Sequence, residues 1–172
     1  MNKMKGLYPE YNGEELREVV YGHTPVPDYK ITESGVVISY KVSKAGKVMK
    51  WTQRSGSADY PSVSIAIPSE ILEVVDKDSW NYIHAKDNLV KRRINVHQLV
   101  ADTWLDFENN CPEHLTPWWN TCDVEFKREL RQYFHIDHID SDRWNPNVSN
   151  LKFVSARANN THNKKTVIKN NS

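Results

Sequence analysis

The sequence of 172 residues predicts an α+β fold, in which a small antiparallel sheet near the N-terminus precedes a strand–loop–strand–helix unit. Two patterns indicate this fold. Residues 29–67 hold short runs in which every second residue is apolar, separated by turns that contain glycine, as in antiparallel hairpins. Residues 134–165 hold two short strand patterns around a polar loop and end on a helical pattern. The length suits one domain of ordinary size or two small modules.

The first third of the chain predicts an irregular arm followed by one small sheet. The arm, residues 1–27, includes one expected helical turn at residues 14–19. The sheet is expected to be a single antiparallel meander over residues 29–67. Its first hairpin turns at Ser34-Gly35, where glycine allows the positive φ that such a turn requires. Its remaining parts are a turn at Ala45-Gly46 and strands at residues 47–52 and 60–67.

The middle of the chain is less regular. The periodicity of residues 97–104 predicts a helix, because Leu99, Val100 and Trp104 then share one side. Asp123 is a favourable first residue for a second helix, over residues 123–134. The other expected elements are strands at residues 70–75, 80–84 and 91–96, and a loop at residues 105–122.

The last part of the chain predicts two short strands and a helix. The strands are expected at residues 133–139 and 151–155, with a polar loop over residues 141–149 between them. Ser155 can cap a final helix over residues 156–165.

Composition and charge limit which partners and which cellular compartment can be expected for the protein. The formal net charge of +1 gives no argument for nucleic acid or a membrane, so such an argument depends on where the charges lie. No apolar run reaches the roughly 18 residues of a membrane span, and the first residues lack the apolar stretch of a signal peptide. We therefore expect a cytoplasmic protein. Cys111 and Cys122 are then expected as free thiols, with a local disulfide as the alternative.

Two stretches of the chain are basic and contain no acid. Trp, Asn, Ser and Gln lie between their cations, which is typical of a surface that follows DNA phosphates. The alternative is an ordinary solvated face. The candidate DNA-binding residues are Lys41, Lys44, Lys47, Lys50 and Arg54 in the first stretch, and Arg143, Lys152, Arg157, Lys164 and Lys165 in the second.

The expected strand–loop–strand–helix unit gathers residues suited to phosphodiester hydrolysis. Asp137 and His138 are adjacent on the first strand, Asn150 opens the second, and Asn159 and His162 share a face of the helix. A carboxylate and an amide oxygen suit a hard divalent cation such as Mg²⁺. A neutral imidazole beside them can deprotonate a water molecule. These groups together suffice for metal-assisted hydrolysis.

This pattern resembles a known family. The segment His135-Ile-Asp-His-Ile-Asp140, followed by Asn150-Leu151 and Asn159, is similar to the HNH (ββα-metal) motif in its phage homing-endonuclease form. Residues 28–40 and Val96-His-Gln-Leu-Val100 are similar to segments that precede the motif in many HNH homing nucleases. The resemblance covers roughly residues 28–67 and 91–165. The chain departs from the family in its third motif position, Asn instead of His, and in a longer connection at residues 105–133.

The resemblance implies a DNA endonuclease with assigned site residues. His138 would be the general base, and Asp137 and Asn159 would hold one Mg²⁺ or Mn²⁺ per active site. Asn150 would orient His138 or brace the loop. The products would carry 5′-phosphate and 3′-hydroxyl ends. Further candidates for metal ligation or support of the site are His162, His135 and Asn163.

The implied partner is double-stranded DNA, with no membrane and no small-molecule cofactor, and a monomer that nicks is expected over a dimer. His97 is expected to be structural, and Trp118 and Trp119 are expected to anchor the insertion. The implied parts of the chain are the arm at residues 1–27, a DNA-binding sheet region at 28–96, a helical connection with an insertion at 97–134, and the catalytic unit with a basic tail at 135–172.

Three alternatives stay open. A DNA-binding protein that has lost cleavage would need none of the motif, so the complete motif set argues against it. A structural metal module would close its coordination with Cys or His, and neither cysteine lies in the motif. A restriction-type or packaging-type HNH nuclease would keep the same chemistry in a different biological setting.

Overall fold

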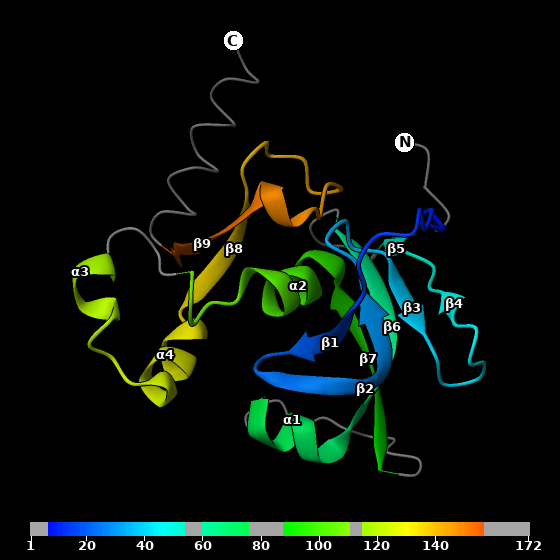
Figure 1. The fold of residues 1–172 in the computed structure, drawn as a ribbon, viewed down its shortest axis with the longest axis horizontal. Coiled ribbons are helices and arrows are strands. Elements are labelled where there is room, and N and C mark those ends of the chain that lie inside the picture. Colours follow the sequence, from blue (N-terminus) through cyan, green and yellow to red (C-terminus); the bar gives the residue numbers. More distant parts are fainter. Residues whose placement is uncertain (1–6, 54–59, 76–87, 111–114, 157–172) are drawn as a thin grey trace.

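The part of the chain that the structure describes folds into two antiparallel sheets, a separate two-stranded hairpin and several short helices (Figure 1). The computed structural model describes residues 7–53, 60–75, 88–110 and 115–156. The α+β class predicted from the sequence is confirmed. None of the helices within these ranges is long and apolar enough to cross a membrane.

The first sheet begins inside the expected arm. The helical turn predicted at residues 14–19 is wrong, because a strand starts there and the arm is not irregular throughout. Val19 and Tyr21 are both buried and lie two residues apart, which is the spacing of a strand. The strands of this sheet, in spatial order, are β1 (Arg17–Tyr21), β2 (Thr24–Ile31), β3 (Val37–Ser39) and β4 (Lys47–Val48).

The turn between β2 and β3 ties the first sheet to the rest of the molecule. Gly35 has a φ of 90°, which confirms the predicted need for glycine. A Cβ at this position would lie 2.7 Å from Val96 Cγ1 and 2.9 Å from Pro146 Cγ, so the backbone approaches both neighbours closely. The amide of Val148 also donates to the carbonyl of Glu33 (2.9 Å). The turn therefore supports the loop that leads to the second strand of the C-terminal hairpin.

A second sheet replaces the expected continuous meander. The prediction of one sheet over residues 29–67 is wrong, because the chain changes sheet between β4 and β5. Apolar side chains of β6 are buried at alternate positions, and Tyr29 of the first sheet accepts a hydrogen bond from the Ala66 amide (3.0 Å). The strands, in spatial order, are β5 (Thr52–Gln53), β6 (Pro61–Pro68) and β7 (Leu89–Asn95).

A helix, α1 (Ser69–Val75), follows β6 where a strand was predicted over residues 70–75, so that prediction is wrong. The neighbouring side chains of Ile71 and Leu72 are both buried. An exposed edge strand would point one of them into solvent, whereas a helix can turn both towards the sheet. The strand predicted at residues 80–84 lies outside the described residues.

The predicted helix over residues 97–104 is confirmed as a continuous helical stretch. It starts as α2 (Val96–Val100) and widens into the π-helical turn η1 (Ala101–Leu105). Leu99, Val100 and Trp104 are buried, as their periodicity predicted. This helix lies between the first sheet and the C-terminal hairpin (Figure 1).

The insertion contains two short helices, α3 (Thr116–Trp119) and α4 (Val124–Arg131). Asp123 caps α4, because its Oδ1 accepts a hydrogen bond from the Phe126 amide (2.8 Å). The helix is shorter than the predicted span of residues 123–134, and Val124 and Phe126 are exposed. Their apolar spacing therefore does not mark a buried face.

The two tryptophans of the insertion behave differently. Trp119 is buried, and its indole N–H donates to the carbonyl of Glu108 (2.9 Å), as expected of an anchor. Trp118 is 63 % exposed and does not anchor the insertion. Cys122 carries a free thiol, as predicted, whereas Cys111 lies outside the described residues.

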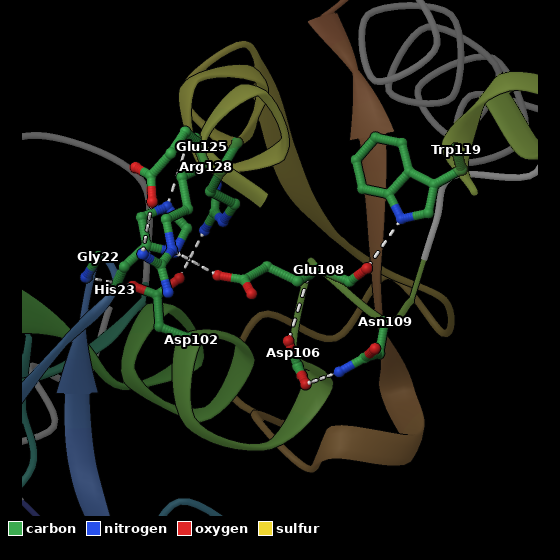
Figure 2. A network of polar contacts seen from close by, with 10 residues as sticks. Gly22, His23, Asp102, Asp106, Glu108, Asn109, Trp119, Glu125 and Arg128 are labelled. Atoms are coloured by element: carbon green, nitrogen blue, oxygen red, sulfur yellow. Dashed lines mark hydrogen bonds and ion pairs between the residues drawn. The ribbon is translucent and has the colours of Figure 1, made fainter. Parts of the chain in front are cut away.

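A polar network connects the helices to the first sheet (Figure 2). Asp102 of η1 accepts a hydrogen bond from the amide of Gly22, at the β1–β2 turn (3.2 Å). The guanidinium of Arg131 pairs with the same carboxylate (2.9 Å) and donates to the carbonyl of Phe134 (3.1 Å). Burial raises the pKa of Asp102, and the nearby Arg131 opposes that rise. Nearer the surface, Glu108 pairs with Arg128 (2.7 Å).

Candidate nuclease site

The C-terminal hairpin positions the central pair of candidate residues. Its strands are β8 (Phe134–His138) and β9 (Leu151–Ser155), close to the two predicted strands. In the antiparallel register, Asp137 lies opposite Lys152 and His138 lies opposite Leu151. The amide of Ile139 donates to the carbonyl of Asn150 (2.8 Å), which extends the pairing to the mouth of the loop. Asp137 and His138 are both buried although they are adjacent.

Asn150 holds the loop between the two strands. It ends the short helix η3 (Val148–Asn150), and its Nδ2 donates to Asp140 Oδ1 and to the carbonyl of Asn145, each at 2.9 Å. Its Oδ1 accepts a hydrogen bond from the amide of Asp140 (3.0 Å). Of the two roles expected of Asn150, these contacts fit bracing of the loop.

Asp140 is the second fixed point of this loop. Its carboxylate accepts hydrogen bonds from Asn145 Nδ2 (2.8 Å), from the Asp142 amide (2.7 Å) and from Asn150. The hydrogen bonds from these donors lower the pKa of Asp140, and the one from Asn145 has the largest effect. The sequence shows Asp140 only as part of the HNH-like segment, because nothing in its pattern shows how many donors converge on one carboxylate.

His138 lies in an aromatic surrounding. Its ring stacks on that of Tyr60, with the ring centroids 5.6 Å apart. It forms a T-shaped pair with the ring of His97, at a centroid distance of 5.0 Å and an interplanar angle of 83°. Burial lowers the pKa of His138 below its usual value, although Asp140, Asp137 and Asp142 act in the opposite direction. Its Nε2 is buried without a hydrogen-bond partner among the described residues. The imidazole is therefore neutral at neutral pH and keeps hydrogen-bonding capacity for another molecule.

His97 and Tyr60 complete this surrounding. His97, in α2, is buried, and desolvation lowers its pKa to about 3, with smaller contributions from His138 and Arg131. The ring of Tyr60 lies 4.5 Å from that of His97, and the guanidinium of Arg143 lies 5.3 Å from the Tyr60 centroid. The sequence predicted a structural role for His97 and no role for Tyr60, since no local motif marks a tyrosine that precedes a strand.

Asp137 faces a cation across the hairpin. Its carboxylate is largely buried, and Oδ2 lies 3.7 Å from Lys152 Nζ. His135, two residues before it on β8, is exposed. A buried carboxylate is a suitable ligand for a hard divalent cation. Within the described residues, no group of three or more His, Cys, Asp or Glu side chains gathers around such a position.

Several candidates lie outside the described residues. One of them is Asn159, which is expected to hold a metal ion together with Asp137. Shared metal binding by these two residues therefore stays a prediction. Ala156 is helical, as expected for the first residue of the final helix. The other candidates outside the described residues are Arg54, Arg157, His162, Asn163, Lys164 and Lys165.

The basic residues of the first stretch lie on a different part of the molecule from His138. Lys41, Lys44, Lys47 and Lys50 lie on or beside β4, which Figure 1 shows at the opposite side from β8 and β9. Two of them lie over tyrosine rings, Lys41 over Tyr29 (5.6 Å) and Lys50 over Tyr8 (5.8 Å). By contrast, Lys152 and Arg143 lie at the hairpin itself.

Comparison with known proteins finds a similarity in sequence. An uncharacterised HNH endonuclease of Acanthamoeba polyphaga mimivirus is 26 % identical over 92 residues, which are 54 % of this chain and 21 % of that protein. Over those 92 residues the chain is similar in sequence to this HNH endonuclease. It spans about a fifth of the length of that relative.

Two further comparisons complete this description. A solved structure of DNA binding and cleavage by the HNH homing endonuclease I-HmuI aligns with 88 % of this chain and 58 % of its own, with a TM-score of 0.48 and 18 % identity. No family model matches the chain.

Proposed function

We propose that this HNH-related chain is a metal-dependent DNA endonuclease of the homing type, encoded by a phage and active in the host cytoplasm. The observation that carries the proposal is the buried Nε2 of His138, which has no hydrogen-bond partner among the described residues, on the hairpin that carries the HNH-like motif and the adjacent buried residue Asp137. The sequence relationship to an HNH endonuclease supports the same activity.

His138 is the general base in this proposal. Its lowered pKa favours the neutral form, which accepts a proton from a water molecule at neutral pH. The water oxygen forms a bond to the scissile phosphorus while the bond from phosphorus to the 3′ oxygen breaks. That oxygen leaves with the bonding electron pair and takes a proton from solvent water, so the products carry 5′-phosphate and 3′-hydroxyl ends.

Asp137 and Asn159 are the residues that would hold one divalent cation, Mg²⁺ or Mn²⁺. A carboxylate and an amide oxygen fit the hard ligands that these ions prefer. When bound, the ion supplies charge stabilisation at the phosphate and at the leaving oxygen. Lys152 neutralises part of the charge on Asp137 without the ion, since its ammonium lies 3.7 Å from the carboxylate. His162, His135 and Asn163 remain candidates for support of this site.

Basic residues would position double-stranded DNA against the hairpin. Arg143 and Lys152 lie near His138 and Asp137, and we assign them to phosphates close to the scissile bond. The exposed lysines around β4 would bind the duplex farther away, where a two-stranded ribbon can enter the major groove. We assign one active site to each monomer, which therefore nicks one strand at a time. The remaining residues of the proposed DNA surface are Arg54, Arg157, Lys164 and Lys165.

Incubation of the protein with supercoiled phage and host DNA tests this function. We expect open-circular product with Mg²⁺ or Mn²⁺ and none with EDTA. DNA ligase should reseal the nicks, because resealing needs a 5′-phosphate and a 3′-hydroxyl. His23→Ala is a suitable histidine control, since His23 lies in the β1–β2 turn and not on the hairpin. DNA binding without cleavage under any metal condition would refute the nuclease proposal and favour a DNA-binding protein. Nicks that ligase cannot reseal would refute the proposed chemistry.

A further inference from the structure

Three rings from three separate segments pack on one another beside the hairpin. Tyr60 precedes β6, His97 belongs to α2 and His138 ends β8. The centroid distances are 4.5 Å between Tyr60 and His97, 5.6 Å between Tyr60 and His138, and 5.0 Å between the two histidines. Each ring thus contacts the other two, and the three form a closed triangle.

The triangle fixes His138 in two directions. The Tyr60 ring is nearly parallel to the imidazole (29°), whereas the His97 ring is nearly perpendicular to it (83°). Because the two neighbouring rings lie at different angles to the imidazole, together they limit its reorientation. Aromatic pairs favour offset stacked and edge-to-face arrangements of this kind.

No hydrogen bond at Nε2 supplies this orientation within the described residues. The Nε2 of His138 has no partner there. Asn150, the residue expected to orient the imidazole, uses its side chain on Asp140 and Asn145. Packing is therefore the visible restraint on the ring.

The two supporting residues are themselves held in place. His97 is 8 % exposed and lies in a helix whose neighbours Val96 and Leu99 are fully buried. Tyr60 is covered by the guanidinium of Arg143, 5.3 Å from its centroid, which comes from the loop between β8 and β9. The sheet region, the central helix and the hairpin thus each contribute to the surrounding of one imidazole.

The geometry points to Tyr60 and His97 as positioning residues, whose rings hold the imidazole of His138 in the orientation that proton transfer requires. This inference rests on the proposed nuclease function, in which His138 is the base. It assigns the effect to ring packing and not to a proton exchanged by His97 or Tyr60. Small errors in the placement of a reacting group cost large factors in rate.

Paired substitutions separate packing from other roles. His97→Ala and Tyr60→Leu remove a ring, whereas His97→Phe and Tyr60→Phe keep one. We expect each ring-removing variant to lower the single-turnover cleavage rate at saturating DNA by about 10- to 100-fold, with DNA affinity unchanged. We expect the phenylalanine variants to recover most of that loss. Circular dichroism and thermal unfolding confirm that each variant folds.

Three results of these assays would overturn the inference. One is a rate within about threefold of wild type in both folded ring-removing variants. Another is an equal loss in His97→Phe and His97→Ala, which would assign the effect to a ring nitrogen. The last is a loss confined to DNA affinity.

A measurement without catalysis keeps the inference testable if the nuclease function fails. The ring ¹H–¹³C signals of His138 should form one narrow set in wild type and in His97→Phe. In His97→Ala they should broaden or split, because the imidazole gains alternative orientations. One unchanged narrow set in His97→Ala would overturn the inference. Absence of cleavage by wild type would instead refute the proposed function. The NMR signals of His138 would then test the packing of the imidazole by themselves.

Discussion

His97 is a buried histidine whose protonation should govern acid stability. Its pKa in the folded protein is about 3, whereas an unfolded chain protonates histidine near 6.5. Between these values the unfolded state binds the extra proton, so the free energy of unfolding falls as pH falls. The stability is complete above about pH 6.5 and is lost at up to about 1.4 kcal/mol per pH unit below it.

Urea unfolding of wild type and His97→Phe between pH 4 and pH 8 checks this prediction. The variant cannot bind that proton, so the difference between the two proteins should grow below pH 6.5. Other groups contribute equally to both proteins and cancel in this difference. Parallel stability profiles would show that His97 is not held neutral by burial.

Asn150 is predicted to act through the loop that it braces. Asn150→Ala removes three hydrogen bonds and leaves the Asp140 carboxylate with fewer donors. We expect a loss of about 1–3 kcal/mol in the free energy of unfolding, together with slower cleavage. Asn150→Asp should be least tolerated near pH 7, because it sets a second carboxylate against Asp140. Chemical unfolding at pH 4 and pH 7 measures this effect, and a pH-independent loss would contradict it.

At the scale of elements, the hairpin turn at Gly35 determines how the first sheet meets the C-terminal loop. Gly35→Ala places a Cβ within 3.0 Å of both Val96 and Pro146 and strains a backbone with positive φ. We expect a destabilisation of about 1–3 kcal/mol, measured by urea unfolding. Gly13→Ala is the matched control, because its φ is also positive while no atom lies within 4 Å of the added carbon. Equal losses in both variants would show that the contacts at Gly35 contribute nothing.

The elements also show how far the sequence predicts this structure. Local signals were sufficient for the Gly35 hairpin, the helix from Val96 and both strands of the C-terminal hairpin. They failed at β1 and α1, where burial against distant segments decides between helix and strand. The change of sheet between β4 and β5 is likewise a tertiary effect, since alternation in sequence does not specify which strands pair.

The candidate site also contains residues that the sequence predicts and residues whose role only the tertiary structure shows. Asp137, His138 and Asn150 stand out in sequence, because chemical type and spacing are local properties. Tyr60 does not, because its ring meets His97 of α2 and His138 of β8, which are far from it in the sequence. The bracing role of Asn150 also depends on the loop conformation, which brings Asp140 and Asn145 to its side chain.

At the scale of the whole molecule, a buried ion pair joins η1 to α4, and further hydrogen bonds of the two partners reach the β1–β2 turn and the first residue of β8. The carboxylate of Asp102 is 2 % exposed and the side chain of Arg131 is 13 % exposed. Removal of one partner leaves an uncompensated buried charge, so Arg131→Met should cost about 3–5 kcal/mol in unfolding free energy. The double variant with Asp102→Asn should be less destabilised than Arg131→Met alone.

Arg128→Ala provides the comparison for this prediction. Its pair with Glu108 is closer (2.7 Å) but more exposed, so its loss should cost about 0–1 kcal/mol. Urea unfolding of the three variants measures the costs. A smaller loss in Arg131→Met than in Arg128→Ala would contradict the account of how the two regions are joined.

The central claim is that the imidazole of His138 carries DNA cleavage. The most direct test is the single-turnover nicking rate of wild type and His138→Ala on the same supercoiled DNA, with saturating Mg²⁺ and equal DNA occupancy. General-base catalysis contributes about 10²- to 10⁴-fold, so we expect the variant to lose at least about 100-fold in rate while it still binds DNA. A folded variant that nicks DNA at the wild-type rate would contradict the claim.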